Sequence, residues 1–366
     1  MTVSTYVSNS PMPSASVKSV FRLDVWYNPI MEQIFKHRTD YKLTTLATDA
    51  DDANVQKVLG KAHAYQISSA KDETPLHWRA NAALLAKTPK LLCVSTSGAG
   101  YDTVDVDACT QAGVLVLCQS GANAVSVAEH TIGLMISLSK RLSESDRRLR
   151  NETGFSRESL MGKELCGKTL GLVGIGHIGS RVARLANALD MRVLAVDPEL
   201  DALTVANRGA EKVALDVLLA ESDFVSLHCP RNESTEKMFD ASTFQVMKPG
   251  SIFVTTARGG IHSESALQEA LEAGHLAGAG LDVWDVEPPP LDHPLLAMPN
   301  VVATYHTAGV THEARRNIAS WAAEQLINTL DGNMPARLVN PEAWEKYSER
   351  YEKIFGHKCA EWNSNL

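Results

Sequence analysis

Short apolar runs alternate with helical patterns along the first third of the chain. The runs are bounded by polar or turn-forming residues and are typical of buried strands. Between them, apolar residues recur every three or four positions, as on one face of a helix. The predicted strands are Phe21–Trp26, Leu43–Leu46, Ala64–Ile67, Leu91–Ser95 and Leu115–Cys118. The predicted helices are Met31–His37, Asn54–Leu59, Asn81–Ala86 and Val106–Ala112. This alternation predicts a parallel sheet with helices on its faces.

The pattern changes at residue 122. Residues 122–149 predict one long helix, in which Gly133 is the only glycine or proline, and a polar stretch follows over 150–168. A second series of elements then begins. Its predicted strands are Thr169–Val173, Arg192–Asp197, Phe224–Cys229, Ile252–Thr255, Gly278–Val283 and Val301–Tyr305. Its predicted helices are Arg181–Leu189, Thr243–Met247, Glu264–Ala273 and Glu313–Leu330.

A chain of 366 residues is long enough for two domains, each with its own core. We expect an α/β fold of two doubly wound parallel-sheet domains, Rossmann-like or flavodoxin-like. Residues 21–121 and 310–366 would form the first domain, and residues 122–309 would form the second, inserted in it. The two crossings would form a hinge around an interdomain cleft, where ligand sites concentrate. Residues 1–20, rich in Ser, Thr and Val, predict a flexible arm.

A glycine-rich segment opens the second series. Gly174, Gly176 and Gly179 have the spacing G-x-G-x-x-G, after the predicted strand Thr169–Val173 and before the predicted helix Arg181–Leu189. The first glycine permits a tight turn, the second lets a pyrophosphate approach the backbone, and the third lets the helix pack close to the strand. Free N–H groups and the positive helix end then face the phosphates. This order favours a dinucleotide-binding loop over an ordinary glycine-rich turn.

An acidic residue ends the next predicted strand. Asp197 follows Gly179 by 18 residues, where a carboxylate can accept hydrogen bonds from the adenine-ribose hydroxyls. A carboxylate there repels a 2′-phosphate, and the following Pro198 and Glu199 supply no arginine to bind one. The sequence therefore favours NAD over NADP.

Composition and charge exclude other classes of protein. The net charge of −8 disfavours nucleic acid or an anionic membrane as the main partner, and no run approaches the roughly 20 apolar residues of a membrane span. The six cysteines form no C-x-x-C pair, which favours a reduced, cytoplasmic protein. The first 20 residues lack the basic start and apolar core of a secretory signal. No cluster has metal-ligand spacing, so we expect no metal.

Three polar residues stand at or beyond the ends of predicted strands in the second series. They are Arg258, Glu287 and His306. Ligands bind at the carboxyl edge of an open parallel sheet, which makes all three candidates for a site. Taken singly, each has a more ordinary interpretation, as a surface ion pair, a solvated loop residue or a structural histidine.

At these residues the chain resembles the D-isomer-specific 2-hydroxyacid dehydrogenases, from about Leu91 to Leu330. The motifs that carry the resemblance are Ser97-Gly-Ala-Gly-Tyr-Asp102, Val127-Ala-Glu-His130, the glycine loop with Asp197, His228-Cys-Pro230, Met247-Lys-Pro-Gly250, Ala257-Arg-Gly259, Leu281-Asp-Val283 with Glu287-Pro288, and His306-Thr-Ala-Gly309. The resemblance implies an NAD-dependent oxidoreductase that transfers a hydride between nicotinamide and a D-2-hydroxy acid or 2-keto acid.

The resemblance also implies roles for single residues. Arg258 would bind the substrate, Glu287 would be the acid partner, and His306 would be the general acid/base. The side-chain types suit the chemistry, because a planar arginine can fork onto a carboxylate and a histidine titrates near neutral pH. The implied cofactor-binding residues are Gly174, Gly176, His177, Ile178, Gly179, Asp197, His228, Cys229, Pro230, Thr256, Ala257, Arg258, Asp282 and His306. The implied substrate-binding residues are Ala99, Gly100, Tyr101, Arg258 and His306, the backbone N–H groups of the first two forming a second carboxylate clamp.

The chain departs from the family pattern at two positions. Tyr305 stands where proline commonly precedes the catalytic histidine, and Thr255 stands where asparagine is common. Neither change removes a catalytic group. The segment 341–362 carries five aromatic residues, which are hard to leave in water. We expect it to pack on the first domain or on a partner subunit.

Two other functions stay open on this scaffold. One is a dehydrogenase of phosphite or formate, and the other is an NADH-sensing interaction protein like the corepressors similar to these enzymes, which keep the same three residues. The expected partners are a small 2-hydroxy or 2-keto acid and a second copy of the chain. The resemblance places that homodimer contact on the helix 122–149 and the loop after it.

Overall fold

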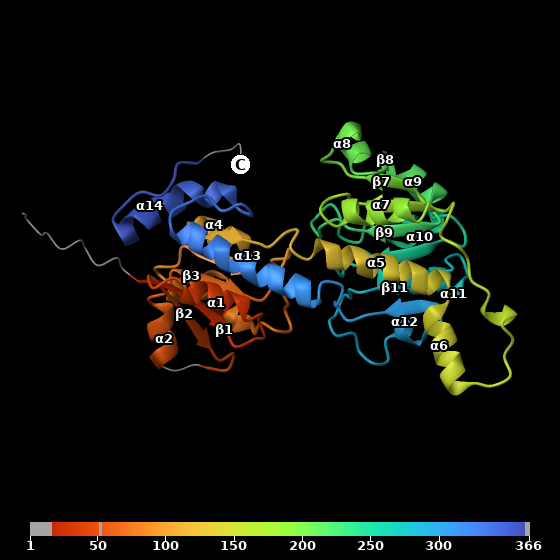
Figure 1. The fold of residues 1–366 in the computed structure, drawn as a ribbon, viewed down its shortest axis with the longest axis horizontal. Coiled ribbons are helices and arrows are strands. Elements are labelled where there is room, and N and C mark those ends of the chain that lie inside the picture. The colour runs from red at the N-terminus through yellow and green to blue at the C-terminus, as the bar shows by residue number, and fades with distance from the viewer. Residues whose placement is uncertain (1–16, 51–52, 363–366) are drawn as a thin grey trace, which may run out of the picture. The chain divides into compact units, whose positions relative to one another are not determined.

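The computed structural model describes residues 17–50 and 53–362 (Figure 1). Residues 1–16, most of the predicted arm, lie outside the described residues. The described chain divides into two compact units: the first comprises residues up to Ser120 and from Arg316 on, and the second is Gly121–Arg315. No helix in the described part of the chain is long and apolar enough to cross a bilayer.

The first unit is built on a five-stranded parallel sheet with the order β2-β1-β3-β4-β5, which is the flavodoxin-like order. Its strands are β1 (Lys18–Leu23), β2 (Tyr41–Leu46), β3 (Ala64–Ile67), β4 (Cys93–Thr96) and β5 (Leu115–Leu117). Its helices are α1 (Ile30–Lys36), α2 (Ala53–Leu59), α3 (Ala82–Lys87), α4 (Val106–Gln111), α14 (Trp344–Phe355) and most of α13 (His312–Leu330). Short 3₁₀ turns lie at Leu76–Trp78 and Pro341–Ala343.

The first strand begins at Lys18, not at Phe21, so the predicted arm 1–20 extends too far along the chain. The strand begins with the polar residues Lys18 and Ser19, so the apolar pattern did not predict its start. Lys18 and Ser19 pair with Tyr41 and Lys42 of β2, where backbone hydrogen bonds decide the structure more than side-chain polarity does.

The aromatic tail packs within the first unit, as the sequence predicts. Helices α13 and α14 cover one face of the sheet, and Trp344, Tyr347 and Tyr351 are buried in the same apolar cluster as strand residues such as Leu115. Buried phenol groups need acceptors. The hydroxyl of Tyr347 donates to the Thr329 carbonyl over 2.7 Å, and that of Tyr351 donates to the Leu330 carbonyl over 3.1 Å.

The second unit contains a seven-stranded parallel sheet with the order β12-β11-β10-β9-β6-β7-β8. This is the Rossmann order, with one strand added at an edge, so the two doubly wound sheets predicted from the sequence are confirmed. The strands are β6 (Thr169–Val173), β7 (Arg192–Val196), β8 (Glu211–Lys212), β9 (Phe224–Leu227), β10 (Ile252–Thr255), β11 (Gly278–Leu281) and β12 (Val301–Ala303). The hinge and the cleft stay predictions.

Apolar clusters cover both faces of this sheet. One face is covered by α5 (Ala124–Ser139), α7 (Gly179–Ala188) and α8 (Ala202–Asn207). The other is covered by α9 (Leu215–Glu221), α10 (Ala241–Val246), α11 (Glu264–Glu272) and α12 (Pro294–Ala297). The sequence pattern did not predict α8, β8, α9 or α12, which are short and mostly exposed on one side.

The single helix predicted over 122–149 is wrong. The structure has α5 and then a separate α6 (Leu142–Asn151), with Arg141 between them in the left-handed conformation at a φ of 54°. The Ser139 carbonyl accepts from the Lys163 N–H over 2.7 Å, so it cannot accept from the next helical turn. Gly162 fits here because a Cβ on it would lie 2.4 Å from that carbonyl oxygen. The break therefore depends on a contact distant in sequence.

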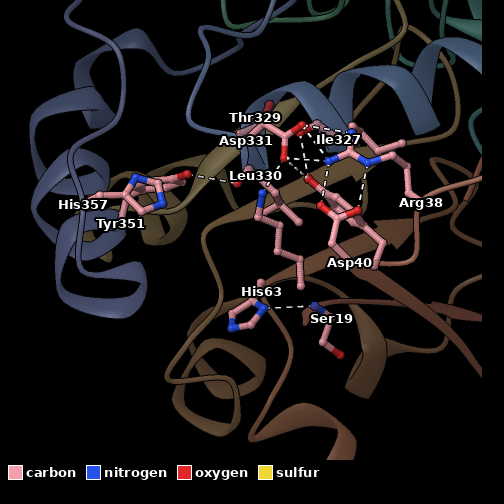
Figure 2. Close-up of polar contacts among 12 residues, drawn as sticks. Ser19, Arg38, Asp40, His63, Ile327, Thr329, Leu330, Asp331, Tyr351 and His357 are labelled. Atoms are coloured by element: carbon pink, nitrogen blue, oxygen red, sulfur yellow. Dashed lines mark hydrogen bonds and ion pairs between the residues drawn. The ribbon is translucent and has the colours of Figure 1, made fainter. Parts of the chain in front are cut away.

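Asp331, just beyond the end of α13, joins that helix to the first two strands of its unit (Figure 2). Its carboxylate pairs with the Lys18 ammonium and with the Arg38 guanidinium at 3.0 Å, and accepts from the Tyr41 hydroxyl over 2.7 Å. Burial alone would raise the pKa of Asp331, but these three donors lower it below its ordinary value. The carboxylate is therefore charged at neutral pH and holds chain segments about 300 residues apart.

We expect Asp331→Asn to lower the free energy of unfolding at pH 7 by about 2 kcal/mol, the range for hydrogen bonds to a charged group. Because folding depresses this pKa, the stabilisation is present above the unfolded pKa and is lost as the pH falls through the folded pKa. The gap between wild type and variant should therefore close in acid. Urea unfolding followed by tryptophan fluorescence measures it, since five of the six tryptophans lie in the first unit.

Asp146→Asn is the matched control. Asp146 pairs with Arg150 on the surface of α6, where solvent screens the pair. A loss of stability in both variants, or a gap in Asp331→Asn that does not change between pH 7 and pH 3, would contradict the assigned role.

Candidate functional site

The three glycines of the loop after β6 meet different surroundings. Gly174 has a φ of +93°, and a Cβ there would lie 2.9 Å from the backbone of His228 and Cys229. A Cβ on Gly179, the first residue of α7, would lie 2.3 Å from the Gly174 carbonyl oxygen. A Cβ on Gly176 would meet nothing within 4 Å. The protein's own backbone thus requires two of the glycines, while the third borders open space, as a position approached by a pyrophosphate should.

Two side chains hydrogen-bond to the backbone of Ile175 in this loop, one to its N–H and one to its carbonyl. The Asp197 carboxylate accepts from the Ile175 N–H over 3.1 Å, and the Arg208 guanidinium donates to the Ile175 carbonyl over 2.6 Å. Arg208 lies at the C-terminal end of α8. Sequence reasoning missed it, because it considered only the residues directly after Asp197 and predicted no helix there.

The residues after β9 line the loop from the side. His228 is half-buried, and its Nε2 lies 3.0 Å from the Ser226 hydroxyl, while its Nδ1 has no hydrogen-bond partner among the described residues. Burial lowers the pKa of His228 to about 4, so the ring is neutral at pH 7. Burial also raises the pKa of the Cys229 thiol to about 11. Neither group is suited to nucleophilic or acid/base chemistry at neutral pH.

His306 and Glu287 form a close pair in the second unit. The Nδ1 of His306 lies 2.8 Å from Oε2 of Glu287, and the other carboxylate oxygen accepts from the Trp284 N–H over 3.1 Å. Burial would raise the pKa of Glu287, but these hydrogen bonds and the charge of Arg258 bring it below its ordinary value. A charged carboxylate thus orients the imidazole through the hydrogen bond to Nδ1.

His306 adopts an unusual backbone conformation. Its φ is 47°, a left-handed geometry that costs about 1–2 kcal/mol for a residue with a Cβ. Hydrogen bonds compensate, because the His306 N–H donates to the Asp282 carbonyl over 2.7 Å. The side chain of Asp282 accepts from the next two N–H groups, those of Thr307 at 2.8 Å and Ala308 at 3.0 Å. The His306 imidazole remains partly exposed, at 42%, so it can reach a ligand.

Asp282 is itself fully buried and has further partners. The Thr304 hydroxyl donates to it over 2.6 Å, and Nε2 of His130 on α5 lies 3.0 Å from that hydroxyl and 3.6 Å from the carboxylate. The Trp284 indole N–H donates to the Thr304 carbonyl over 3.0 Å. Sequence reasoning gave Thr304 no role. A signal existed, since it lies two residues before His306, but a threonine near a strand end is common.

Arg258 lies in the loop after β10, as the sequence predicts, and one of its guanidinium nitrogens donates to the Ala257 carbonyl over 2.7 Å. Strands β10, β11 and β12 are neighbours in the sheet, and Arg258, Glu287 and His306 all follow their carboxyl ends. The predicted convergence at one sheet edge is therefore what the topology produces. Thr256 and Ala257 lie in the same loop, and Thr256 contacts the Thr131 hydroxyl at 3.2 Å.

The predicted substrate loop of the first unit follows β4. The Ser97 N–H donates to the Ile67 carbonyl over 3.0 Å, and the Gly98 carbonyl accepts from the Gln119 N–H over 2.6 Å. These contacts fix the start of the loop. The N–H groups of Ala99 and Gly100 donate no hydrogen bond within the described residues. The Tyr101 side chain is exposed.

A parallel sheet with a glycine loop and an acidic residue at its carboxyl edge defines a dinucleotide-binding α/β protein. The family described as D-isomer specific 2-hydroxyacid dehydrogenase, NAD binding domain, matches residues 132–308. The chain is 40% identical over 259 residues to the D-3-phosphoglycerate dehydrogenase of Archaeoglobus fulgidus, covering 71% of this chain and 49% of that protein. It is 36% identical over 300 residues to the hydroxypyruvate reductase of Thermotoga maritima, covering 81% and 94%.

A solved structure agrees with these matches. The D-lactate dehydrogenase from Aquifex aeolicus, complexed with NAD and lactic acid, superposes with a TM-score of 0.75 at 28% identity, over 87% of this chain and 98% of that one. The chain spans about half the length of the phosphoglycerate dehydrogenases that it matches. It belongs to the family of D-isomer specific 2-hydroxyacid dehydrogenases. The resemblance predicted from the motifs, and NAD as the cofactor, are confirmed.

Because Arg208 holds the Ile175 carbonyl, we expect Arg208→Leu to loosen the glycine loop and raise the dissociation constant of NADH. Loss of one hydrogen bond from a charged group, about 1.5 kcal/mol or more, corresponds to a change of about tenfold or more. NADH fluorescence titration measures it. Arg184→Leu, at an exposed arginine of α7, is the control and should bind as wild type. Equal affinities for Arg208→Leu and wild type would remove this role.

Proposed function

We propose that the chain is an NAD-dependent oxidoreductase acting on D-2-hydroxy acids or the corresponding 2-keto acids. The observation that carries this proposal is the 2.8 Å pair of His306 and Glu287 beside Arg258, at the carboxyl ends of β10, β11 and β12. The glycine loop after β6 opens at the same edge of the same sheet. The description of the family names this reaction. The candidate site residues supply the functional groups that the reaction needs.

Bound NAD would supply the hydride acceptor, and NADH the hydride donor. The residues to hold it are those of the glycine loop, Asp197, the segment 228–230, and Thr256, Ala257, Arg258, Asp282 and His306. Gly176, which borders open space, fits a pyrophosphate. Asp197 can accept from ribose hydroxyls with the lone pairs that its bonds to Ile175 and Glu199 leave free.

Three side chains would act on the substrate, and two of them, Arg258 and His306, would also border the cofactor. Arg258 would fork onto the carboxylate and the reacting oxygen, because its donors are planar and permanently charged. His306 would take the hydroxyl proton in oxidation and return it in reduction. Glu287, charged at neutral pH, would fix the ring and stabilise the imidazolium. We propose that the first unit contributes a second carboxylate clamp through the N–H groups of Ala99 and Gly100.

The two alternatives keep the same residues and differ in the reaction. A phosphite or formate dehydrogenase would use this scaffold with another donor. An NADH-sensing interaction protein would bind NADH tightly and turn over no acid. The proposal therefore needs a test in which cofactor binding and turnover are measured separately.

We expect His306→Ala to lower kcat for 2-keto acid reduction by about 10²–10⁴-fold, the usual contribution of a general acid/base, while the dissociation constant of NADH stays near the wild-type value. Absorbance at 340 nm gives the turnover, and fluorescence gives the binding. His312→Ala, at an exposed histidine that starts α13, is the control and should keep full activity. Wild-type turnover in His306→Ala would refute the assignment.

We also propose that the chain forms a homodimer through the region of α5, α6 and the following loop. Leu142, Leu149 and Met161 are exposed in this region, at 52%, 74% and 71%, although the rest of α6 is strongly polar. Apolar side chains projecting from a charged helix are typical of a surface covered by another chain.

If this surface is the dimer contact, Leu149→Lys combined with Met161→Lys should halve the mass in solution, because buried lysines leave unpaired charges in the interface. Light scattering after size exclusion measures the mass. Leu203→Lys, at a 71% exposed leucine of α8, is the control and should leave the dimer intact. A double variant with the wild-type mass would exclude this surface.

A further inference from the structure

Three side chains and two backbone N–H groups form a chain of contacts behind the loop that carries His306. Nε2 of His130 lies 3.0 Å from the Thr304 hydroxyl, which donates to the Asp282 carboxylate over 2.6 Å. That carboxylate accepts from the N–H groups of Thr307 and Ala308. The chain therefore runs from α5, through the end of β12, to the backbone directly after His306.

The direction of each hydrogen bond is fixed by chemistry. A carboxylate in this site only accepts, so the Thr304 hydroxyl must give its proton to Asp282. Its lone pairs then face His130, which must present Nε2–H. His130 and Asp282 are 3.6 Å apart, too far for a direct hydrogen bond. The hydroxyl of Thr304 is thus the bridge between the helix and the carboxylate.

The loop needs this support, because His306 has a left-handed backbone that a residue with a Cβ rarely adopts. Successive N–H groups that converge on one anion hold such a turn. Asp282 is that anion. It is fully buried, so its oxygens are stable there only while their hydrogen bonds are made. If one donor is lost, the carboxylate is expected to shift and the N–H groups of Thr307 and Ala308 to lose their acceptor.

We propose that Thr304, with His130 behind it, is a positioning residue that holds Asp282 and thereby sets the direction of the His306 imidazole. Neither residue touches the substrate in this account. The proposal rests on the proposed function for its effect on turnover, but its effect on the loop is independent of any reaction. The role is specific to the hydroxyl of Thr304, and serine should replace it.

The test compares the full-length wild type with Thr304→Val, which removes the hydroxyl at nearly constant volume, and with Thr304→Ser, which keeps it. Thr243→Val is the matched control, because its hydroxyl, on α10, also lies within hydrogen-bond distance of a carboxylate, that of Asp240 at 3.1 Å. Hydrogen–deuterium exchange of the peptide that contains residues 306–308 reports the loop directly.

We expect exchange at these amides to be about tenfold faster in Thr304→Val and to return toward the wild-type rate in Thr304→Ser, since a lost hydrogen bond of about 1.4 kcal/mol is tenfold in an equilibrium. Turnover should fall by a similar factor in kcat, with KM for the 2-keto acid within about twofold. His130→Leu should change both quantities in the same direction. The double variant His130→Leu with Thr304→Val should have nearly the same exchange rate and kcat as Thr304→Val alone, because His130 acts on the loop only through Thr304.

Unchanged exchange and turnover in Thr304→Val would overturn the proposal. A loss that serine does not restore, or that appears equally in Thr243→Val, would assign Thr304 a general packing role and would also overturn it. If the wild type reduces no 2-keto acid, the proposed function fails, but the exchange measurement still decides the role of Thr304. If Thr304→Val does not fold, the same two measurements compare His130→Leu, which removes the contact to Thr304, with Thr304→Ser, which keeps the hydroxyl.

Discussion

The contact between His306 and Glu287 is the interaction on which the candidate site depends, and it needs a backbone that does not form by itself. His306 is left-handed, and Asp282 supports that geometry with its carbonyl and its carboxylate. The carboxylate can remain buried because it accepts hydrogen bonds from Thr304 and two backbone N–H groups. The pair of His306 and Glu287 is thus the exposed end of a buried polar network that reaches α5.

The glycine loop also combines positions that contact only the protein with a position that leaves room for a ligand. Gly174 and Gly179 are required by contacts inside the protein, whereas Gly176 leaves room for a ligand. Asp197 and Arg208 then fix the peptide groups on either side of Ile175. Preorganisation of this kind lowers the ordering cost on binding, because the loop does not have to be fixed by the cofactor. In both places, contacts within the protein hold the residues that we propose to meet a ligand.

Much of this fold could be predicted from the sequence, because buried parallel strands are continuous apolar runs. Strands β3, β6 and β10 begin and end where the pattern predicts. The break between α5 and α6 could not be predicted, because it depends on Lys163 and Gly162, about 20 residues away, and not on a local glycine or proline. Helix α8 was missed for a related reason, since its single fully buried apolar residue, Val205, gives no periodic pattern.

In the candidate site, too, residues in local sequence motifs could be predicted, and residues that act through distant contacts could not. Arg258, Glu287 and His306 could be found because they sit in recognisable motifs at strand ends. Thr304 and Arg208 could not, because their importance comes from which atoms they reach, and ordinary threonines and arginines near strand or helix ends look the same in sequence. The aromatic segment around α14 was an intermediate case. Its burial could be predicted from composition, but its acceptors at Thr329 and Leu330 could not.

The central claim is that this edge of the second sheet oxidises and reduces 2-hydroxy acids of one hand with NAD. The most direct test follows absorbance at 340 nm with the purified full-length chain, NAD or NADP, and paired D- and L-2-hydroxy acids, with formate and phosphite as further donors. The account predicts turnover of a D-acid with NAD, little with its L-enantiomer, and weaker use of NADP. Tight NADH binding without turnover of any D-2-hydroxy acid would contradict it.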